Sequence, residues 1–128
     1  MKRLYVSLGL IALLAVMSGA HTLYLARFTD ELSGLLTLAQ ERAERGDWEG
    51  AIQVTRQAQK QWADNEGYLH ITLRHADIDA ILISFDEALA FLQADEHQSA
   101  EYAAVNAKLL TQLALLLEEE LPTLTNVL

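Results

Sequence analysis

The sequence predicts an all-α protein, in which an N-terminal transmembrane helix continues into a small antiparallel bundle of about four helices. Three observations support this class. Apolar residues recur with a helical period over most of the chain. Six glycines, one proline and few alternating β-branched residues leave no segment that is typical of a strand. The uncharged stretch from Leu4 to Leu25 is long enough to cross a membrane.

The N-terminal segment is best interpreted as an uncleaved membrane anchor over residues 1–26. Lys2 and Arg3 precede the uncharged stretch, whose length of about 22 residues is close to the roughly 20 that a spanning helix needs. Basic residues flanking a span favour the cytoplasmic side. We therefore predict a cytoplasmic N-terminus, with residues 27–128 forming an extracytoplasmic acidic helical bundle.

A second interpretation of the same segment is a cleaved signal peptide. Ser18-Gly19-Ala20 offers small residues at the spacing of a signal-peptidase site, and cleavage after Ala20 would release a secreted helical protein. His21 and Thr22 follow this site and lie near the outer end of the span. With Tyr24 beside them, they are typical of residues at the membrane surface rather than of a functional pair inside it.

The part of the chain after the anchor is strongly acidic and lacks cysteine. From Arg27 onward seven basic residues oppose all 18 acidic ones, which gives a balance of −11. Such a charge disfavours nucleic acid and anionic lipid headgroups as partners. The absence of cysteine excludes disulfides, thiolate catalysis and cysteine-ligated metal. About 100 residues suffice for one small domain.

The first helix is predicted to run on from the membrane as far as Arg45, because no helix breaker lies between Leu25 and Arg45. Gly46 and Asp47 then supply both halves of a tight turn. Glycine readily adopts the left-handed conformation after a helix, and an aspartate side chain accepts from free N–H groups at the start of the next one. The apolar positions of the first helix share one face: Phe28, Leu32, Leu35, Leu36, Ala39 and Ala43.

A second and a third helix follow, separated by a break over Asp64-Asn65-Glu66-Gly67. The second is predicted to begin at Trp48 and the third to run from about Tyr68 to Gln93. The apolar face of the second helix contains Trp48, Ala51, Ile52, Thr55, Ala58 and Trp62. The predicted core positions of the third helix are Ile71, Ile78, Ile81, Leu82, Phe85, Ala88, Leu89 and Leu92.

Asp95 and Gln98 resemble a capping box that opens the fourth helix. This helix is predicted to end near Pro122, and the apolar tail Thr123–Leu128 is expected to dock on the bundle. Because the connections are short, the helices should pack antiparallel. The buried face of the fourth helix contains Tyr102, Val105, Leu109, Leu113 and Leu116, with Leu110 and Leu117 beside it.

The histidines are the residues that suggest chemistry most directly. His75 and Asp79 are four residues apart, so they share a helix face and can supply two ligands to a divalent metal. A zinc site needs a third protein ligand, and His70 is expected to point elsewhere on the same helix. An ion pair or hydrogen bond is therefore the favoured interpretation. Asp77 and Asp86 are about 13 Å apart along a helix, too far for one pair of catalytic carboxylates.

Two further sets of residues are candidates for binding a partner. Trp48 and Trp62 lie on nearly the same face of the second helix, where tryptophan either fills a core or anchors a partner, and the core is favoured. Glu118, Glu119 and Glu120 form an acidic run that is unfavourable at a helix C-terminus. This run is interpreted as a solvated helix end, with a basic partner or a loosely bound cation as the alternative.

Several motifs along the chain are shared with a known family: the anchor, Gly46-Asp47-Trp48 followed by Ala51 and Ile52, Trp62, His75-Ala76-Asp77-Ile78-Asp79 and the ending Leu124-Thr125-Asn126-Val127-Leu128. With these motifs the chain resembles the bacterial domain of unknown function 4363. The resemblance implies a short protein with one membrane anchor, of a kind known mainly from Gram-positive spore-forming bacteria, to which no activity is assigned.

The segment Gly46–Ile52 is also similar to the turn inside a tetratricopeptide repeat. A related turn at Asp95 follows Asp47 by about 48 residues, whereas the repeat has a period of roughly 34. We interpret this likeness as a shared way of building a helical hairpin.

The sequence contains no nucleophile constellation and no phosphate-binding loop, so we expect no enzymatic activity and no cofactor. The expected function is protein–protein interaction, or an accessory-subunit role, at the outer face of a bacterial cytoplasmic membrane, with a membrane or envelope protein as partner and no nucleic acid. The alternatives are a metal- or ligand-sensing bundle that uses His75 and Asp79, and a secreted helical protein.

Overall fold

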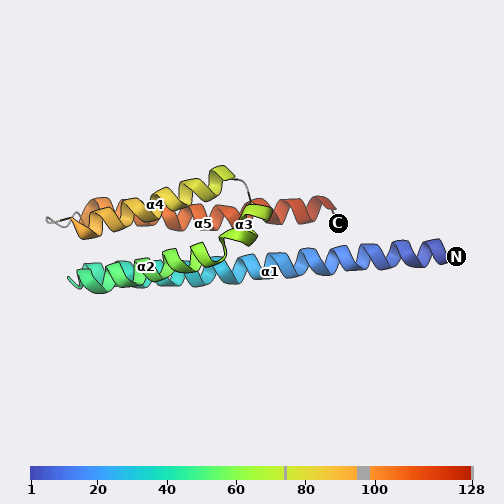
Figure 1. Ribbon diagram of the computed structural model, residues 1–128, viewed down its shortest axis with the longest axis horizontal. Coiled ribbons are helices and arrows are strands. Elements are labelled where there is room, and N and C mark those ends of the chain that lie inside the picture. Colours follow the sequence, from blue (N-terminus) through green and yellow to red (C-terminus); the bar gives the residue numbers. More distant parts are fainter. Residues whose placement is uncertain (74, 95–98, 128) are drawn as a thin grey trace.

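The computed structural model describes residues 1–73, 75–94 and 99–127, with side chains for all of these except 72 and 119–127. The longest element is α1 (Lys2–Glu44), a single helix of 43 residues. Its N-terminal part extends alone beyond the other helices, and its C-terminal part packs among them (Figure 1). Residues 1–17 are all exposed, whereas Leu25 is fully buried. The predicted continuous helix from the leader into the bundle is confirmed.

The turn after α1 forms as its two residues predict. Gly46 has a φ of +83°, in the left-handed region that favours glycine. Asp47 caps the next helix, α2 (Trp48–Asp64), by accepting a hydrogen bond from the Gly50 amide at 3.0 Å. The α1–α2 hairpin is therefore set by local chemistry at two adjacent positions.

The predicted third helix is wrong as a single element, because the chain bends sharply within it. Asn65 alone separates α2 from a short helix, α3 (Glu66–Thr72), and α4 (His75–Gln93) follows. Leu73 is extended, with φ −117° and ψ 163°. The bend brings Leu69 fully into the core and packs Leu73 against it, so tertiary burial outweighs local helix propensity. Ile71, predicted to be buried, is 84% exposed as a result.

The last helix, α5 (Ser99–Val127), does not end near Pro122 as predicted. A proline inside a helix removes one N–H donor and crowds the preceding turn, but a helix can continue at that cost. The capping box predicted at Asp95 and Gln98 lies outside the described residues. The side chains of the tail Thr123–Leu128 lie outside them as well.

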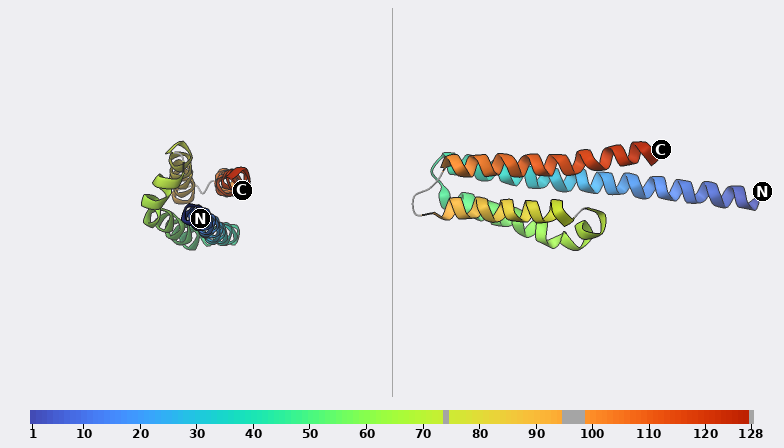
Figure 2. Two further views of the ribbon diagram at one scale, coloured as in Figure 1. Left: turned by 90° about the vertical axis from the view of Figure 1, so that its right-hand side faces the viewer. Right: turned by 90° about the horizontal axis from the view of Figure 1, so that it is seen from above.

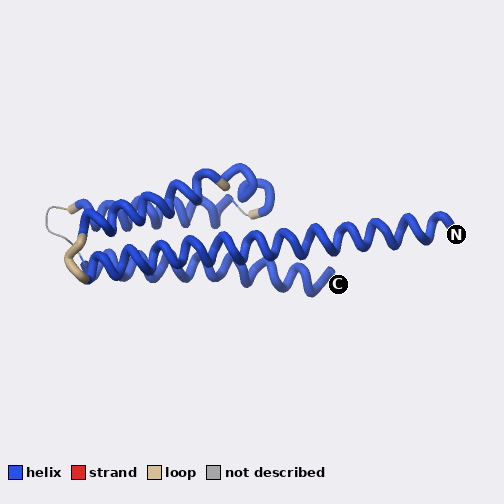
Figure 3. Tube along the Cα trace, turned by 90° about the horizontal axis from the view of Figure 1, so that it is seen from below, coloured by secondary structure: helices blue, strands red, loops and turns tan. Residues whose placement is uncertain are grey.

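The four long helices form an antiparallel bundle, as predicted. Each of α1, α2, α4 and α5 packs against two of the others, α1 against α2 and α5, and α4 against α2 and α5. Seen end-on, they surround one interior (Figure 2). The short helix α3 closes the bundle at the end where α2 meets α4, on the side from which the N-terminal part of α1 extends (Figure 3).

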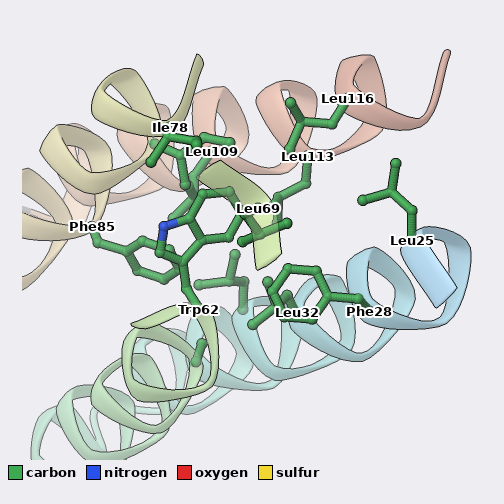
Figure 4. Packing of buried hydrophobic residues seen from close by; sticks show 13 residues of the cluster. Leu25, Phe28, Leu32, Trp62, Leu69, Ile78, Phe85, Leu109, Leu113 and Leu116 are labelled. Carbon is green, nitrogen blue, oxygen red and sulfur yellow. The ribbon is translucent and has the colours of Figure 1, made fainter. Parts of the chain in front are cut away.

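The core has two parts along the bundle axis. The part nearer the N-terminus of α1 is built from large side chains, including Trp62, Phe28 and Phe85 (Figure 4). The distal part contains Ala43, Ala51 and Ala88 with larger neighbours, so small residues line much of it. The predicted apolar faces are confirmed at the buried positions Phe28, Leu32, Leu36, Ala39, Ala43, Ala51, Thr55, Ala58, Trp62, Ile78, Ile81, Phe85, Ala88, Leu92, Tyr102, Val105, Leu109, Leu113 and Leu116.

Candidate ligand groove and other predicted sites

An open groove lies where α1 leaves the bundle, between α1 and the C-terminal end of α2. Its volume is about 410 Å³, within the range of roughly 300 to 1,000 Å³ that is usual for small-molecule sites. The lining residues come from two elements only: Ala20, Leu23, Tyr24, Arg27, Phe28 and Glu31 of α1, and Gln61 and Asn65 at the end of α2.

The spacing along α1 explains why these side chains share the groove. Residues three and four apart on a helix are neighbours on its surface. Leu23, Arg27 and Glu31 are separated by four residues each, and all three are exposed on the side of α1 away from the core. The groove therefore changes along the helix from apolar at Leu23 to cationic at Arg27 and anionic at Glu31.

A chain of hydrogen bonds ties the wall of the groove to α1. The Tyr24 hydroxyl donates to the side-chain oxygen of Asn65, whose amide nitrogen donates to the Gln61 carbonyl at 2.8 Å. The Gln61 side-chain amide in turn donates to Glu31 Oε2 at 2.6 Å. Tyr68 on α3 packs edge-on against Tyr24, with ring centroids 4.7 Å apart. The end of α2 and the start of α3 are thus held against the helix that leaves the bundle.

The two charges in the groove are not paired with each other. Within the part of the chain that the structure describes, Arg27 makes no hydrogen bond or ion pair. Glu31 accepts the Gln61 amide, but no described cation contacts it. Both groups retain hydrogen-bonding capacity for a ligand.

The bend between α3 and α4 changes the surroundings of the predicted metal ligands. His70 was expected to point elsewhere, yet its Nδ1 lies 3.1 Å from Nδ1 of His75, because the two residues now face each other across the corner. His70 Nε2 also lies 3.4 Å from a Glu66 carboxylate oxygen. Asp79 is exposed, and no cluster of three metal-binding side chains occurs among the described residues.

The residues predicted as partner contacts lie in different environments. Trp62 is fully buried and stacks on Phe28, with ring centroids 5.8 Å apart. Trp48 is half-buried at the edge of the distal core. Glu118 is exposed on α5, and the side chains of Glu119 and Glu120 lie outside the described ones. Trp48 and Glu118 are accessible from solvent, whereas Trp62 is a core residue.

Tyr102 is a buried titratable group in the distal core. Burial raises its pKa to about 12, the Glu44 carboxylate adds to the effect, and the nearby Thr55 hydroxyl offsets part of it. The Thr55 hydroxyl donates to the Ala51 carbonyl at 2.8 Å, and the phenol oxygen of Tyr102 has no hydrogen-bond partner among the described residues. The neutral phenol is therefore strongly favoured in the folded state.

The groove was not predicted from the sequence, because the residues on its two sides belong to different predicted regions. Ala20 and Leu23 were assigned to the membrane span and Tyr24 to its surface, Asn65 was assigned to a helix break, and Gln61 was given no role. The one available signal was Arg27, the single basic residue between Arg3 and Arg42.

Comparison with known proteins places the chain in a family. One helix of the described residues, α1, is long and apolar enough to cross a membrane, a property that a signal sequence shares. No curated protein and no solved structure matches the chain. The family model described as a domain of unknown function, DUF4363, matches residues 20–127. This confirms the resemblance noted in the sequence, and the chain belongs to the DUF4363 family.

Proposed function

We propose that the chain is a non-enzymatic, membrane-anchored protein whose outer bundle binds another membrane or envelope protein. The observation that carries this proposal is the change in exposure along α1. Before Ser18 its apolar side chains are exposed on every side, Leu4, Ile11 and Leu14 by 60% or more. Such a surface is unfavourable in water and is covered when the helix lies in hydrocarbon.

The contacts that α1 makes with the bundle just after the cleavage site favour an uncleaved anchor. Removal of residues 1–20 would leave Tyr24 and Leu25, which already contact α3 and the core, close to a new and charged N-terminus. Lys2 and Arg3 favour a cytoplasmic N-terminus, which leaves the acidic bundle outside. A partner with a basic surface suits the balance of −11, and Trp48 and Glu118 are accessible positions for it.

The absence of cysteine from the sequence makes the topology directly testable. A single Glu49→Cys substitution at an exposed position near the distal turn supplies one thiol for a membrane-impermeant maleimide. We expect labelling of intact cells and a full-length mass after extraction in mild detergent. Labelling only after lysis would contradict the orientation, and a mass beginning at His21 would establish the secreted alternative.

The partner is tested by native mass spectrometry and crosslinking of the full-length protein in its own membranes. A photo-crosslinker at Lys60, an exposed position on α2, is compared with one at Ile11 inside the anchor. A recurrent envelope protein captured from Lys60 supports the proposal. Repeated absence of a partner, together with a small-molecule turnover that depends on His75, would overturn it.

The second candidate function is metal sensing, which the 3.1 Å approach of His70 to His75 favours. Two nitrogen ligands at about 2.0 to 2.1 Å from one zinc ion can be separated by such a distance. The pair is thus His70 with His75 rather than His75 with Asp79. Zinc titration by calorimetry should show a heat that His70→Ala abolishes and Asp79→Ala leaves unchanged; the absence of heat removes this candidate.

A further inference from the structure

We propose that the groove between α1 and the end of α2 binds one zwitterionic glycerophospholipid of the outer leaflet, with its phosphate at Arg27 and its ammonium group at Glu31. This proposal rests on the membrane anchoring proposed above. It adds a lipid ligand to the protein partner proposed above.

The order of groups along α1 matches the order of groups in such a lipid. Moving outward from the membrane, the groove presents Leu23, then Arg27, then Glu31, each step rising about 6 Å along the helix axis. A zwitterionic phospholipid presents its acyl chains, then a phosphate, then an ammonium group. Bound beside α1 in its ordinary bilayer orientation, it places each charge next to the opposite one.

Arg27 is suited to the phosphate because its guanidinium has no described partner and is planar. Guanidinium groups bind phosphate oxygens through two parallel hydrogen bonds, which are stronger than neutral ones. The nearest basic positions in sequence are Arg3 and Arg42. Arg27 is therefore the one arginine or lysine of α1 between Arg3 and Arg42, and it lies where the uncharged span ends, which is the depth of the outer phosphates.

Glu31 supplies the selectivity for a lipid that carries an ammonium group. Its side chain is held by the Gln61 amide at 2.6 Å, and the second carboxylate oxygen has no hydrogen-bond partner among the described residues. An anionic lipid without an ammonium group leaves this carboxylate unpaired beside its own negative charge. The acidic balance of the whole outer domain acts in the same direction.

The walls of the groove are already in place without the lipid. Phe28 lines the groove and is packed in the core, and Tyr24 is held by its hydrogen bond to Asn65. A ligand that meets a preformed site loses less free energy to ordering of the protein. The apolar end of the groove, at Ala20 and Leu23, opens toward the region where acyl chains lie.

The test is native mass spectrometry of the full-length protein in mild detergent, loaded with phosphatidylethanolamine or phosphatidylglycerol at matched concentrations. We expect one retained phosphatidylethanolamine, in preference to phosphatidylglycerol. Arg27→Gln should lower its apparent affinity at least tenfold, because a hydrogen bond to a charged group is stronger than a neutral one. Glu31→Gln should remove most of the preference between the two lipids. Arg45→Gln, which removes the same charge at the distal end of α1, should change neither.

One further variant and one competition experiment test whether the acyl chains of the lipid contribute to binding. Leu23→Trp fills the apolar end without changing the charge and should also reduce retention, while the helical circular dichroism of every variant is compared with the native signal. Glycerophosphoethanolamine, which has the headgroup without chains, should compete weakly. Strong competition by it would identify a soluble phosphate compound as the ligand and overturn the lipid assignment.

The outcomes separate the two proposals. Equal retention of both lipids, or retention that Arg27→Gln leaves unchanged, overturns the groove proposal while the full-length mass still supports the anchor. A mature mass beginning at His21 overturns the anchor, and the lipid proposal with it.

Discussion

Replacement of Trp62 by alanine removes the largest of the fully buried side chains in the described core. A tryptophan buries about 200 Å², which at about 25 cal/mol/Å² corresponds to about 5 kcal/mol. The alanine side chain retains a small part of this burial energy. Removal of the buried indole N–H, which has no described hydrogen-bond partner, also relieves a cost of about 1 kcal/mol and so reduces the net loss of stability. We therefore expect Trp62→Ala to reduce the free energy of unfolding by about 3 kcal/mol.

The assay is thermal unfolding of the full-length protein in mild detergent, followed by circular dichroism at 222 nm. A loss of about 3 kcal/mol corresponds to a Tm lower by about 15 °C for a domain of this size. Trp62→Phe keeps a ring against Phe28 and removes the unpaired N–H, so its Tm should fall much less. Trp48→Ala, at a half-buried site on the same helix, is the matched control and should cost about 1 kcal/mol. A Tm for Trp62→Ala no lower than that of Trp48→Ala would refute the core assignment and return Trp62 to the set of partner contacts.

Three other predictions test separate parts of the structure by the same unfolding assay. Gly46→Ala should cost about 1 kcal/mol because of the positive φ alone, since no atom would crowd the new methyl group, and an unchanged Tm would contradict this turn conformation. The raised pKa of Tyr102 means that the native state holds its proton more tightly than the unfolded chain, so the free energy of unfolding should fall between pH 10 and pH 12, by about 2 to 3 kcal/mol at most. A Tyr102→Phe variant with the same fall would refute this cause. Ile71→Lys should change stability by less than about 0.5 kcal/mol, because Ile71 is exposed, whereas Leu69→Ala should cost about 2 to 5 kcal/mol. The reverse order for this last pair would support one unbroken helix.

Local sequence patterns were sufficient wherever one helix face or one turn decides the structure. The α1 face from Phe28 to Ala43 and the Gly46-Asp47 turn depend on residues within a few positions of each other. Periodicity and capping chemistry report such short-range features directly. The order of helices and most of the core were therefore predictable.

The bend at Leu73 and the continuation of α5 past Pro122 were not predictable in this way. No glycine or proline marks the bend, whose cause is the burial of Leu69 and Leu73 against distant helices. Proline is normally a stop signal, and its tolerance in α5 is not visible in the local pattern. The meeting of His70 with His75 was missed for the same reason as the bend itself.

The continuity of α1 has a mechanical consequence for a chain anchored as proposed. No linker separates the span from the bundle, so any tilt of the helix in the bilayer is passed to the whole outer domain. The turn at Gly46 is about 28 Å beyond Arg27 along the axis. A tilt of about 20°, typical of spanning helices, therefore moves this turn sideways by roughly 10 Å over the membrane surface. A change in bilayer thickness that alters the tilt is thus converted into a lateral displacement at the distal end, where a peripheral partner would meet the bundle.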